Sequence, residues 1–156
     1  MMSRAIIAAA LFATAFPVST VAQAPTWNVE QTAVWTVVTQ SWADEAAKNG
    51  RWPGNYVHDR VVGWDSSWPL PRYKTSIEKW SRFQDKQRQI LEYELAPAAI
   101  TVAGDTAVVH YTGVSVSQRA QDKPEREMFG AVETLVRSGG TWKFLSVTGF
   151  DLKKGN

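Results

Sequence analysis

Apolar residues in the first part of the chain recur at the spacing of an α-helix. A helix predicted over residues 28–48 has one apolar face, made of Val34, Trp35, Val38 and Trp42. Asn28 followed by Gln31 is typical of a capping box, and Gly50 is a suitable end. A second helix is predicted over residues 73–85, where one stripe carries Tyr73, Ile77, Trp80 and Gln84. Both helices precede most of the strand-like sequence.

Later in the chain the hydrophobic period changes from helical spacing to alternation, which is typical of β-strands. A short β-branched run also stands between the two helices. Turns fall at residues 104–105, 122–124 and 138–140, where Gly, Asp and Pro concentrate. The predicted strands cover residues 59–64, 91–95, 100–102, 106–117, 127–137 and 141–151. Helices followed by hairpin-linked strands indicate an α+β fold, with the helices gathered on one face of an antiparallel sheet.

The first residues read as an export signal. Arg4 supplies a positive start, residues 5–18 are almost wholly apolar, and small residues follow. The apolar run is shorter than the roughly 20 residues that span a bilayer. Cleavage is expected after Ala22 rather than Ala24, because Pro25 would obstruct the second site. Residues 1–22 are therefore a predicted signal peptide and residues 23–156 a single domain, released into the periplasm or secreted.

Composition restricts the chemistry of the mature domain. Losing Arg4 with the signal leaves 16 basic and 15 acidic residues, a balance that argues against a nucleic-acid partner. The chain has no cysteine, so disulfides and thiol catalysis are excluded. Its two histidines stand 52 positions apart without metal-ligand spacing, and we expect neither a metal nor a cofactor. Eight tryptophans suit a packed core, an aromatic pocket, or both.

Several groups of residues, in this order, resemble a known superfamily. They are Val34-Trp35 to Trp42, His58 to Trp64, Pro71 to Lys74 with Ile77 and Trp80, Glu94 to Pro97, Ile100 to Val102, Gly104 to Tyr111 and Gly139 to Trp142. Together they resemble the nuclear transport factor 2-like superfamily, in particular its SnoaL-like bacterial branch. The resemblance covers nearly the whole mature chain, and none of its parts is a catalytic signature.

This resemblance implies a cone: a strongly curved antiparallel sheet wrapped around the long N-terminal helix, with a pocket at the open end. It also implies frequent homodimers. Members of the superfamily include ketosteroid isomerases, scytalone dehydratase, polyketide cyclases and many proteins that are not enzymes. The fold by itself therefore does not decide the function.

Asp59 and His110 are the candidate catalytic residues. Asp59 opens a short strand beside aromatic residues, where desolvation would raise its pKa toward a value useful for proton abstraction. The alternative is an aspartate that caps a turn. His110 shares a strand face with apolar residues, so it is either a core residue or a catalyst.

The candidate ligand-binding residues are aromatic, with one carboxylate. Tyr111 points to the opposite face from His110, so only one of them enters the pocket. Glu133 interrupts an apolar strand; it would orient a ligand if it faces inward, but we expect it to face solvent, as we do Glu92 and Glu94. A further set flanks the predicted pocket mouth and forms either a stacking surface or ordinary core: Trp64, Trp68 and Trp80.

Three functions follow from these residues. The domain binds a small apolar or aromatic molecule, or it catalyses isomerisation, dehydration or cyclisation with Asp59 as base, or it is an interaction module that dimerises. The lack of a dense polar constellation favours binding over catalysis. No membrane partner is expected for the mature domain, because no second long apolar run follows the signal.

Signal cleavage yields the first testable prediction. The exported protein should begin at Gln23, because Thr20-Val21-Ala22 places small residues before the cut. N-terminal sequencing of the protein from the periplasm or medium measures this directly. A mature protein that still begins at Met1 would contradict the export prediction.

Overall fold

The computed structural model describes residues 26–152, so the predicted signal peptide lies outside the described residues. Along the chain come α1 (Val29–Ala46), β1 (Val57–Asp65), β2 (Arg72–Tyr73), α2 (Lys74–Gln87), β3 (Arg88–Ala103), β4 (Thr106–Arg119), β5 (Glu125–Ser138) and β6 (Thr141–Asp151). The α+β class predicted from the sequence is confirmed, with both helices near their predicted bounds. Within the described residues, no helix is long and apolar enough to cross a membrane.

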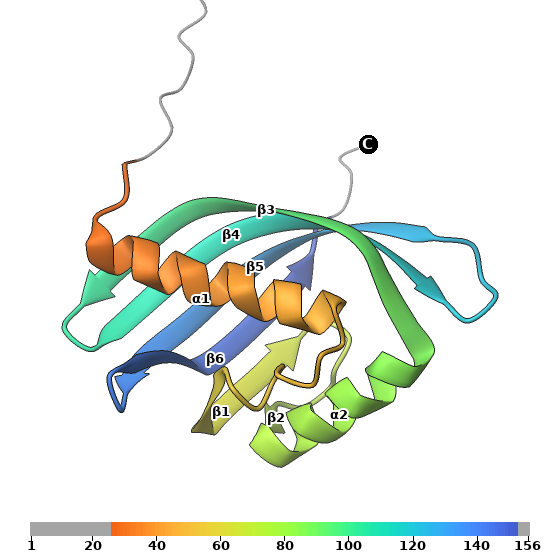
Figure 1. The fold of residues 1–156 in the computed structure, drawn as a ribbon, viewed down its shortest axis with the longest axis horizontal. Coiled ribbons are helices and arrows are strands. Elements are labelled where there is room, and N and C mark those ends of the chain that lie inside the picture. Colours follow the sequence, from red (N-terminus) through yellow and green to blue (C-terminus); the bar gives the residue numbers. More distant parts are fainter. Residues whose placement is uncertain (1–25, 153–156) are drawn as a thin grey trace, which may run out of the picture.

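The six strands form one sheet in the order β2-β1-β6-β5-β4-β3 (Figure 1). Neighbouring strands are antiparallel, as expected, except that β1 and β6 run parallel. A parallel pair needs a long crossover connection. Here the connection contains β2, α2 and the three strands β3, β4 and β5. The sheet is therefore mixed at this one pair.

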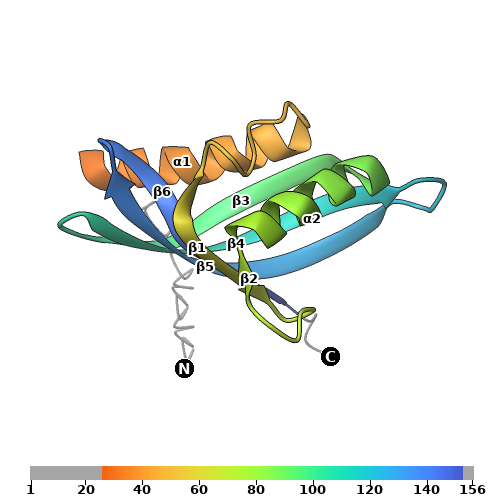
Figure 2. The same ribbon diagram turned by 90° about the horizontal axis from the view of Figure 1, so that it is seen from below.

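Helix α1 lies across the concave face of the sheet, and α2 lies on the same side near β1 and β2 (Figures 1 and 2). The capping box predicted at the start of α1 is present, because Asn28 and Gln31 each accept a backbone hydrogen bond from the other at 2.9 Å. The predicted apolar face holds Val34 and Val38, both fully buried. Trp42 on the same face is only half-buried, since it borders a cavity.

Strand β3 joins two strands that the sequence predicted separately. Pro97 stands between them. Proline has no backbone N–H to donate, but β3 is an edge strand, so Pro97 is tolerated there without the loss of a hydrogen bond between inner strands. The register with β4 shifts between Ile90 and Glu92 and again between Pro97 and Ala99. Such bulges bend a strand and increase its twist. The bent β3 arches over α1 and ends the cone beside α2 (Figure 1).

The core lies between α1 and the inner face of the sheet. Its members are Val34, Val38, Val57, Val61, Ile100, Ala107, Val109, Tyr111, Ala131, Leu135, Trp142 and Phe144. Inward residues of β4 and β5 alternate with outward ones, as the period of two predicts. The core ends before the pocket end of the cone, where aromatic and polar side chains replace the aliphatic ones.

Gly113 on β4 makes room for an aromatic ring, which gives a prediction about stability. The ring of Phe129 covers the place where a Cβ at Gly113 would lie, and Phe129 stacks on Trp42 at 5.1 Å between ring centroids. Gly113→Ala should therefore destabilise the fold by about 1–3 kcal/mol through overpacking. Denaturant unfolding monitored by tryptophan fluorescence measures the loss.

Gly130→Ala is the matched control. A Cβ there would meet Phe150, whose ring is exposed on the outer face of the sheet and is free to rotate away. It should cost less than Gly113→Ala. Equal losses in both variants would contradict the tight packing of Phe129.

Candidate functional site

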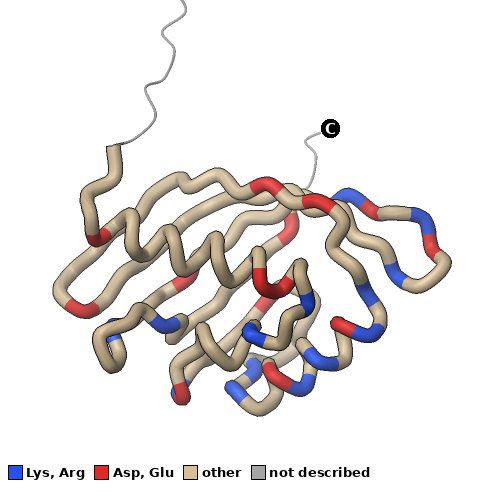
Figure 3. Tube along the Cα trace, in the orientation of Figure 1, with Lys and Arg blue, Asp and Glu red and all other residues tan. Residues whose placement is uncertain are grey.

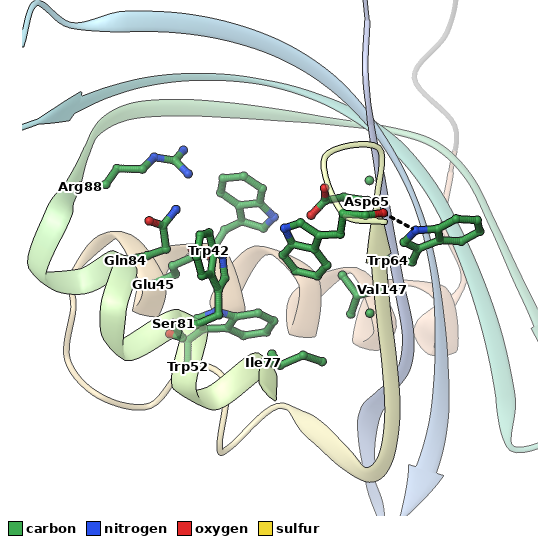
Figure 4. A pocket seen from close by; sticks show the side chains of 14 residues that line it. Trp42, Glu45, Trp52, Trp64, Asp65, Ile77, Ser81, Gln84, Arg88 and Val147 are labelled. Carbon is green, nitrogen blue, oxygen red and sulfur yellow. Dashed lines mark hydrogen bonds between the residues drawn. The ribbon is translucent and has the colours of Figure 1, made fainter. Parts of the chain in front are cut away.

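A cavity of about 280 Å³ lies between α1, α2 and the inner face of the sheet (Figure 4). We call it the outer chamber. Five of its lining residues are tryptophans from five different segments: Trp42, Trp52, Trp64, Trp68 and Trp80. Trp64 contributes from the rim, because its ring lies on the far side of β1 and its Nε1 donates to the Trp68 carbonyl at 2.9 Å (Figure 4).

A second space of about 140 Å³ adjoins the outer chamber at its deep end. We call it the inner chamber. The two chambers share Trp42, Glu45, Trp52, Val147 and Gly149. The inner chamber adds residues from β4 and β5, among them Tyr111 and Glu133. The sheet positions them together, because Glu133 pairs with Val147 across the strands and Tyr111 pairs with Ala131.

A row of hydrogen bonds ends in the inner chamber. Trp42 Nε1 donates to Tyr111 Oη at 3.1 Å, and the Tyr111 hydroxyl donates to Glu133 Oε1 at 2.9 Å. Trp35 and Phe129 pack edge-on against the Tyr111 ring and fix its position. The Glu133 residue is only 5% exposed, and its Oε2 is buried without a hydrogen-bond partner in the part of the chain that the structure describes.

Two carboxyl groups of the cavity have raised pKa values. Burial raises the pKa of Glu133 to about 8; the hydrogen bond from Tyr111 opposes the rise and the nearby Glu45 adds to it. Burial also raises the pKa of Glu45 to about 7, against the attraction of Arg88 and with the repulsion of Asp85. Both groups therefore exchange protons within the neutral pH range, which is where general acids and bases and proton-linked binding sites operate.

Asp44, the other fully buried carboxyl among residues 26–152, behaves in the opposite way. Its oxygens accept hydrogen bonds from the Tyr56 hydroxyl, from Asn49 at 2.7 Å and from Gln40 at 3.3 Å. These bonds, that of Tyr56 foremost, lower the pKa of Asp44. Asp44 is thus a satisfied structural carboxylate, whereas Oε2 of Glu133 is buried and has no hydrogen-bond partner among the described residues.

The predicted catalytic residues do not line either chamber. The side chain of Asp59 is 88% exposed, and Lys74 binds it at 2.5 Å, a hydrogen bond that lowers its pKa instead of raising it. The ladder of β1 to β6 is irregular between Val57 and Val62, the stretch that contains Asp59. His110 is exposed on the outer face of β4, because Tyr111 occupies the inner position. Of the two alternatives for His110, the core position is therefore wrong.

The predicted ligand-binding residues lie at the cavity. Tyr111 and Glu133 face the inner chamber, while Trp68 and Trp80 face the outer one. The expectation that Glu133 faces solvent is wrong, because the register of β5 places it beside Ala131 and Leu135 on the inner face. Glu92 and Glu94 are exposed as predicted.

Sequence reasoning missed Glu45, Trp52, Arg88 and Gly149 as lining residues. For Glu45 a signal existed: it follows Trp42 by three residues and therefore lies on the same side of α1 as the apolar face. Trp52 and Arg88 come from a loop and a helix-strand junction, whose positions depend on the tertiary fold. Among residues 26–152, no group of three potential metal ligands lies close together.

Comparisons with known proteins support the fold. No family model matches the chain, and no curated protein matches it. A ketosteroid isomerase-like protein from Erwinia carotovora atroseptica superposes with a TM-score of 0.71 at 11% identity, over 82% of this chain and 100% of the other. A nuclear transport factor 2-like protein from Cytophaga hutchinsonii gives 0.69 at 11% identity, over 81% and 100%.

A candidate dehydratase of the same fold family from Streptomyces avermitilis gives a TM-score of 0.67 at 16% identity, over 81% of this chain and 97% of that one. The chain therefore has the nuclear transport factor 2-like fold, as the sequence resemblance implied. Likeness at these identities concerns the fold, so the function must be argued from the cavity itself.

The buried Glu133 predicts how stability depends on pH. Between its ordinary pKa of 4.5 and the folded value of about 8, the folded protein binds a proton that the unfolded chain has released. The free energy of unfolding should therefore fall as pH rises from 5 to 8, by at most about 1.4 kcal/mol per pH unit for this proton. Glu133→Gln should make that fall less steep.

Urea unfolding at several pH values measures the effect. Glu94→Gln removes an exposed carboxyl and should leave the pH dependence of the wild type unchanged. If Glu133→Gln and the wild type lose stability in parallel between pH 5 and 8, the pKa of Glu133 is not raised.

Proposed function

We propose that the protein binds a small, largely aromatic or apolar molecule in the two adjoining chambers, with one polar group of the ligand at Glu133. The observation that carries the proposal is the tryptophan-lined outer chamber, which leads to a buried carboxyl oxygen with no partner in the described chain. Cavities of this kind, apolar with a few directed polar groups, are typical of small-molecule sites.

The walls of the cavity are held in place before a ligand arrives. Trp42 is fixed on one side by the parallel ring of Phe129, at an interplanar angle of 9°, and by its hydrogen bond to Tyr111. At the mouth, Trp68 and Trp80 meet edge to face at 6.2 Å. A preorganised wall saves the entropy that ordering side chains would cost on binding.

A second function is favoured by the two carboxyl groups that titrate near neutral pH. Glu133, helped by Tyr111, would serve as the acid or base of an isomerase, dehydratase or cyclase, in place of the exposed Asp59. Structural neighbours named as ketosteroid isomerase-like and as a candidate dehydratase are compatible with such proton transfers. This function would be identified by turnover of a bound molecule that is lost in the Glu133→Gln variant and retained in the Asp59→Asn variant.

We further propose that the domain acts outside the cytoplasm, as the charged start and apolar run of residues 1–18 support. A homodimer, or another contact typical of an interaction module, is supported by apolar side chains on the outer face of the sheet. Met128 and Phe150 are 39% and 44% exposed there. This face lies away from the cavity, so dimerisation and binding are compatible.

Gly149 offers a direct test of the proposed site. It lines both chambers, and a Cβ added there would meet no atom within 4 Å. Gly149→Leu should therefore fill the junction of the chambers and weaken binding about tenfold or more, while the domain stays folded. Titrations of intrinsic tryptophan fluorescence with a panel of naphthols, steroid-like and polyketide-like molecules measure the affinity.

Gly54→Leu is the matched control, because Gly54 also has open space around it but lies outside both chambers. It should bind as the wild type does, and so should Asp59→Asn. The proposal fails if the panel leaves wild-type fluorescence unchanged, or if Gly149→Leu binds with unaltered affinity.

A further inference from the structure

We propose that the ligand of the cavity is an organic cation, an aromatic or alkyl ammonium ion whose charged head lies between the tryptophan rings and the carboxyl groups of Glu45 and Glu133. This inference rests on the proposed function and specifies its ligand class. It is carried by three observations: the type of aromatic residue, the charge of the lining, and the unpartnered oxygen of Glu133.

Tryptophan is the aromatic side chain that attracts cations most strongly, and the attraction grows when the cation is desolvated. The rings at the mouth already show this contact. The guanidinium carbon of Arg72 lies 3.4 Å from the ring centroid of Trp68 and 4.4 Å from that of Trp80. Trp42 and Trp52 belong to the lining of both chambers, and Phe129 already stacks on one face of Trp42.

The ionisable lining of the chambers is mainly acidic. Glu45, Asp65 and Glu133 line the chambers together with one basic residue, Arg88, and a second basic residue, Arg72, stacks on the tryptophans at the mouth. Figure 4 shows Glu45 and Arg88 on one side of the outer chamber and Asp65 on the other. Lys and Arg gather along α2 (Figure 3), but Lys79, Arg82 and Lys86 are exposed and line neither chamber. A bound ligand therefore meets more acidic groups than basic ones.

Glu133 distinguishes a cation from a neutral ligand. Its Oε1 is already bound by Tyr111, and its buried Oε2 has no partner in the described residues. A buried carboxylate oxygen of this kind costs free energy unless a hydrogen-bond donor or a positive charge lies beside it. A cation nearby favours the ionised carboxylate, so binding would release the proton. A neutral ligand that accepts a hydrogen bond would instead require the protonated form.

The two cases have opposite pH dependence. The groups that set the protonation of the site are Glu133 with Tyr111 from the sheet, Glu45 from α1, and Asp85 and Arg88 at the end of α2. The folded pKa values of about 7 and 8 place the titration of Glu45 and Glu133 in the neutral range. The affinity for a cation should rise as pH increases from 6 to 9, whereas that for a neutral acceptor should fall.

Phenyltrimethylammonium and tert-butylbenzene are suitable probes, because they have the same shape and differ by one positive charge. We expect phenyltrimethylammonium to bind about tenfold tighter than tert-butylbenzene at pH 8. The affinity for phenyltrimethylammonium should also increase as the pH rises. Isothermal titration calorimetry and tryptophan fluorescence on the mature protein measure both. In Glu133→Gln the affinity for the cation should drop about tenfold, while that for tert-butylbenzene stays the same.

Glu94→Gln is the control with an equal change of charge outside the cavity, and it should bind both probes as the wild type does. Glu45→Gln repeats the comparison if Glu133→Gln does not fold. Equal or tighter binding of tert-butylbenzene, or cation affinity that is constant or falls with pH, overturns the cation inference and leaves the proposed cavity function intact. If neither probe nor any member of the aromatic panel binds, both proposals fail.

Discussion

The packing of α1 into the concave face of the sheet positions everything else in this domain. Val34 and Val38 anchor the helix at zero exposure, and the Gln31 side chain donates to the Ile100 carbonyl at 2.7 Å. Because these contacts fix the position of the helix on the sheet, its following turns bring Trp42 and Glu45 to the cavity at the open end of the cone. Strand β3 carries two register shifts and arches over the helix. The cavity is thus a consequence of where the aliphatic packing ends.

The contrast between Asp44 and Glu133 explains why the open end is more than a packing defect. Both carboxyls are buried, and an unpaired buried charge is costly. The cost of burying Asp44 is offset by hydrogen bonds from Tyr56, Asn49 and Gln40, so it stabilises the end of α1 as a carboxylate. Glu133 has only Tyr111, and burial keeps its pKa high. A fold that only needed stability would gain from an apolar residue there, and buried carboxyls with a raised pKa are typical of functional sites.

The aromatic residues divide between those that support the inner chamber and those that lie at the mouth of the outer one. Trp35, Phe129 and Tyr111 pack on one another and hold the row of hydrogen bonds. Trp68 and Trp80 lie at the mouth, where Arg72 stacks on both. The nuclear transport factor 2-like fold is compatible with many chemistries, so the specificity of this chain must come from such lining residues. Those lining residues combine tryptophan faces with carboxyls, a combination that suits an organic cation.

The sequence by itself determined both helices, most of the strands and the α+β class, because hydrophobic periodicity and turn residues such as Gly104 and Gly139 act locally. The fold family followed from the resemblance of its residue groups to a known superfamily. The sequence also identified Tyr111, Trp68 and Trp80 as residues to consider. Only the tertiary structure decided which faces turn inward. Alternation places His110 and Tyr111 on opposite faces, but only the packing of α1 decides which face is the interior. The same packing buried Glu133 and left Asp59 to pair with Lys74 in solvent. The burial and the pKa of a side chain depend on neighbours that are distant in sequence, and the local sequence pattern does not identify these neighbours.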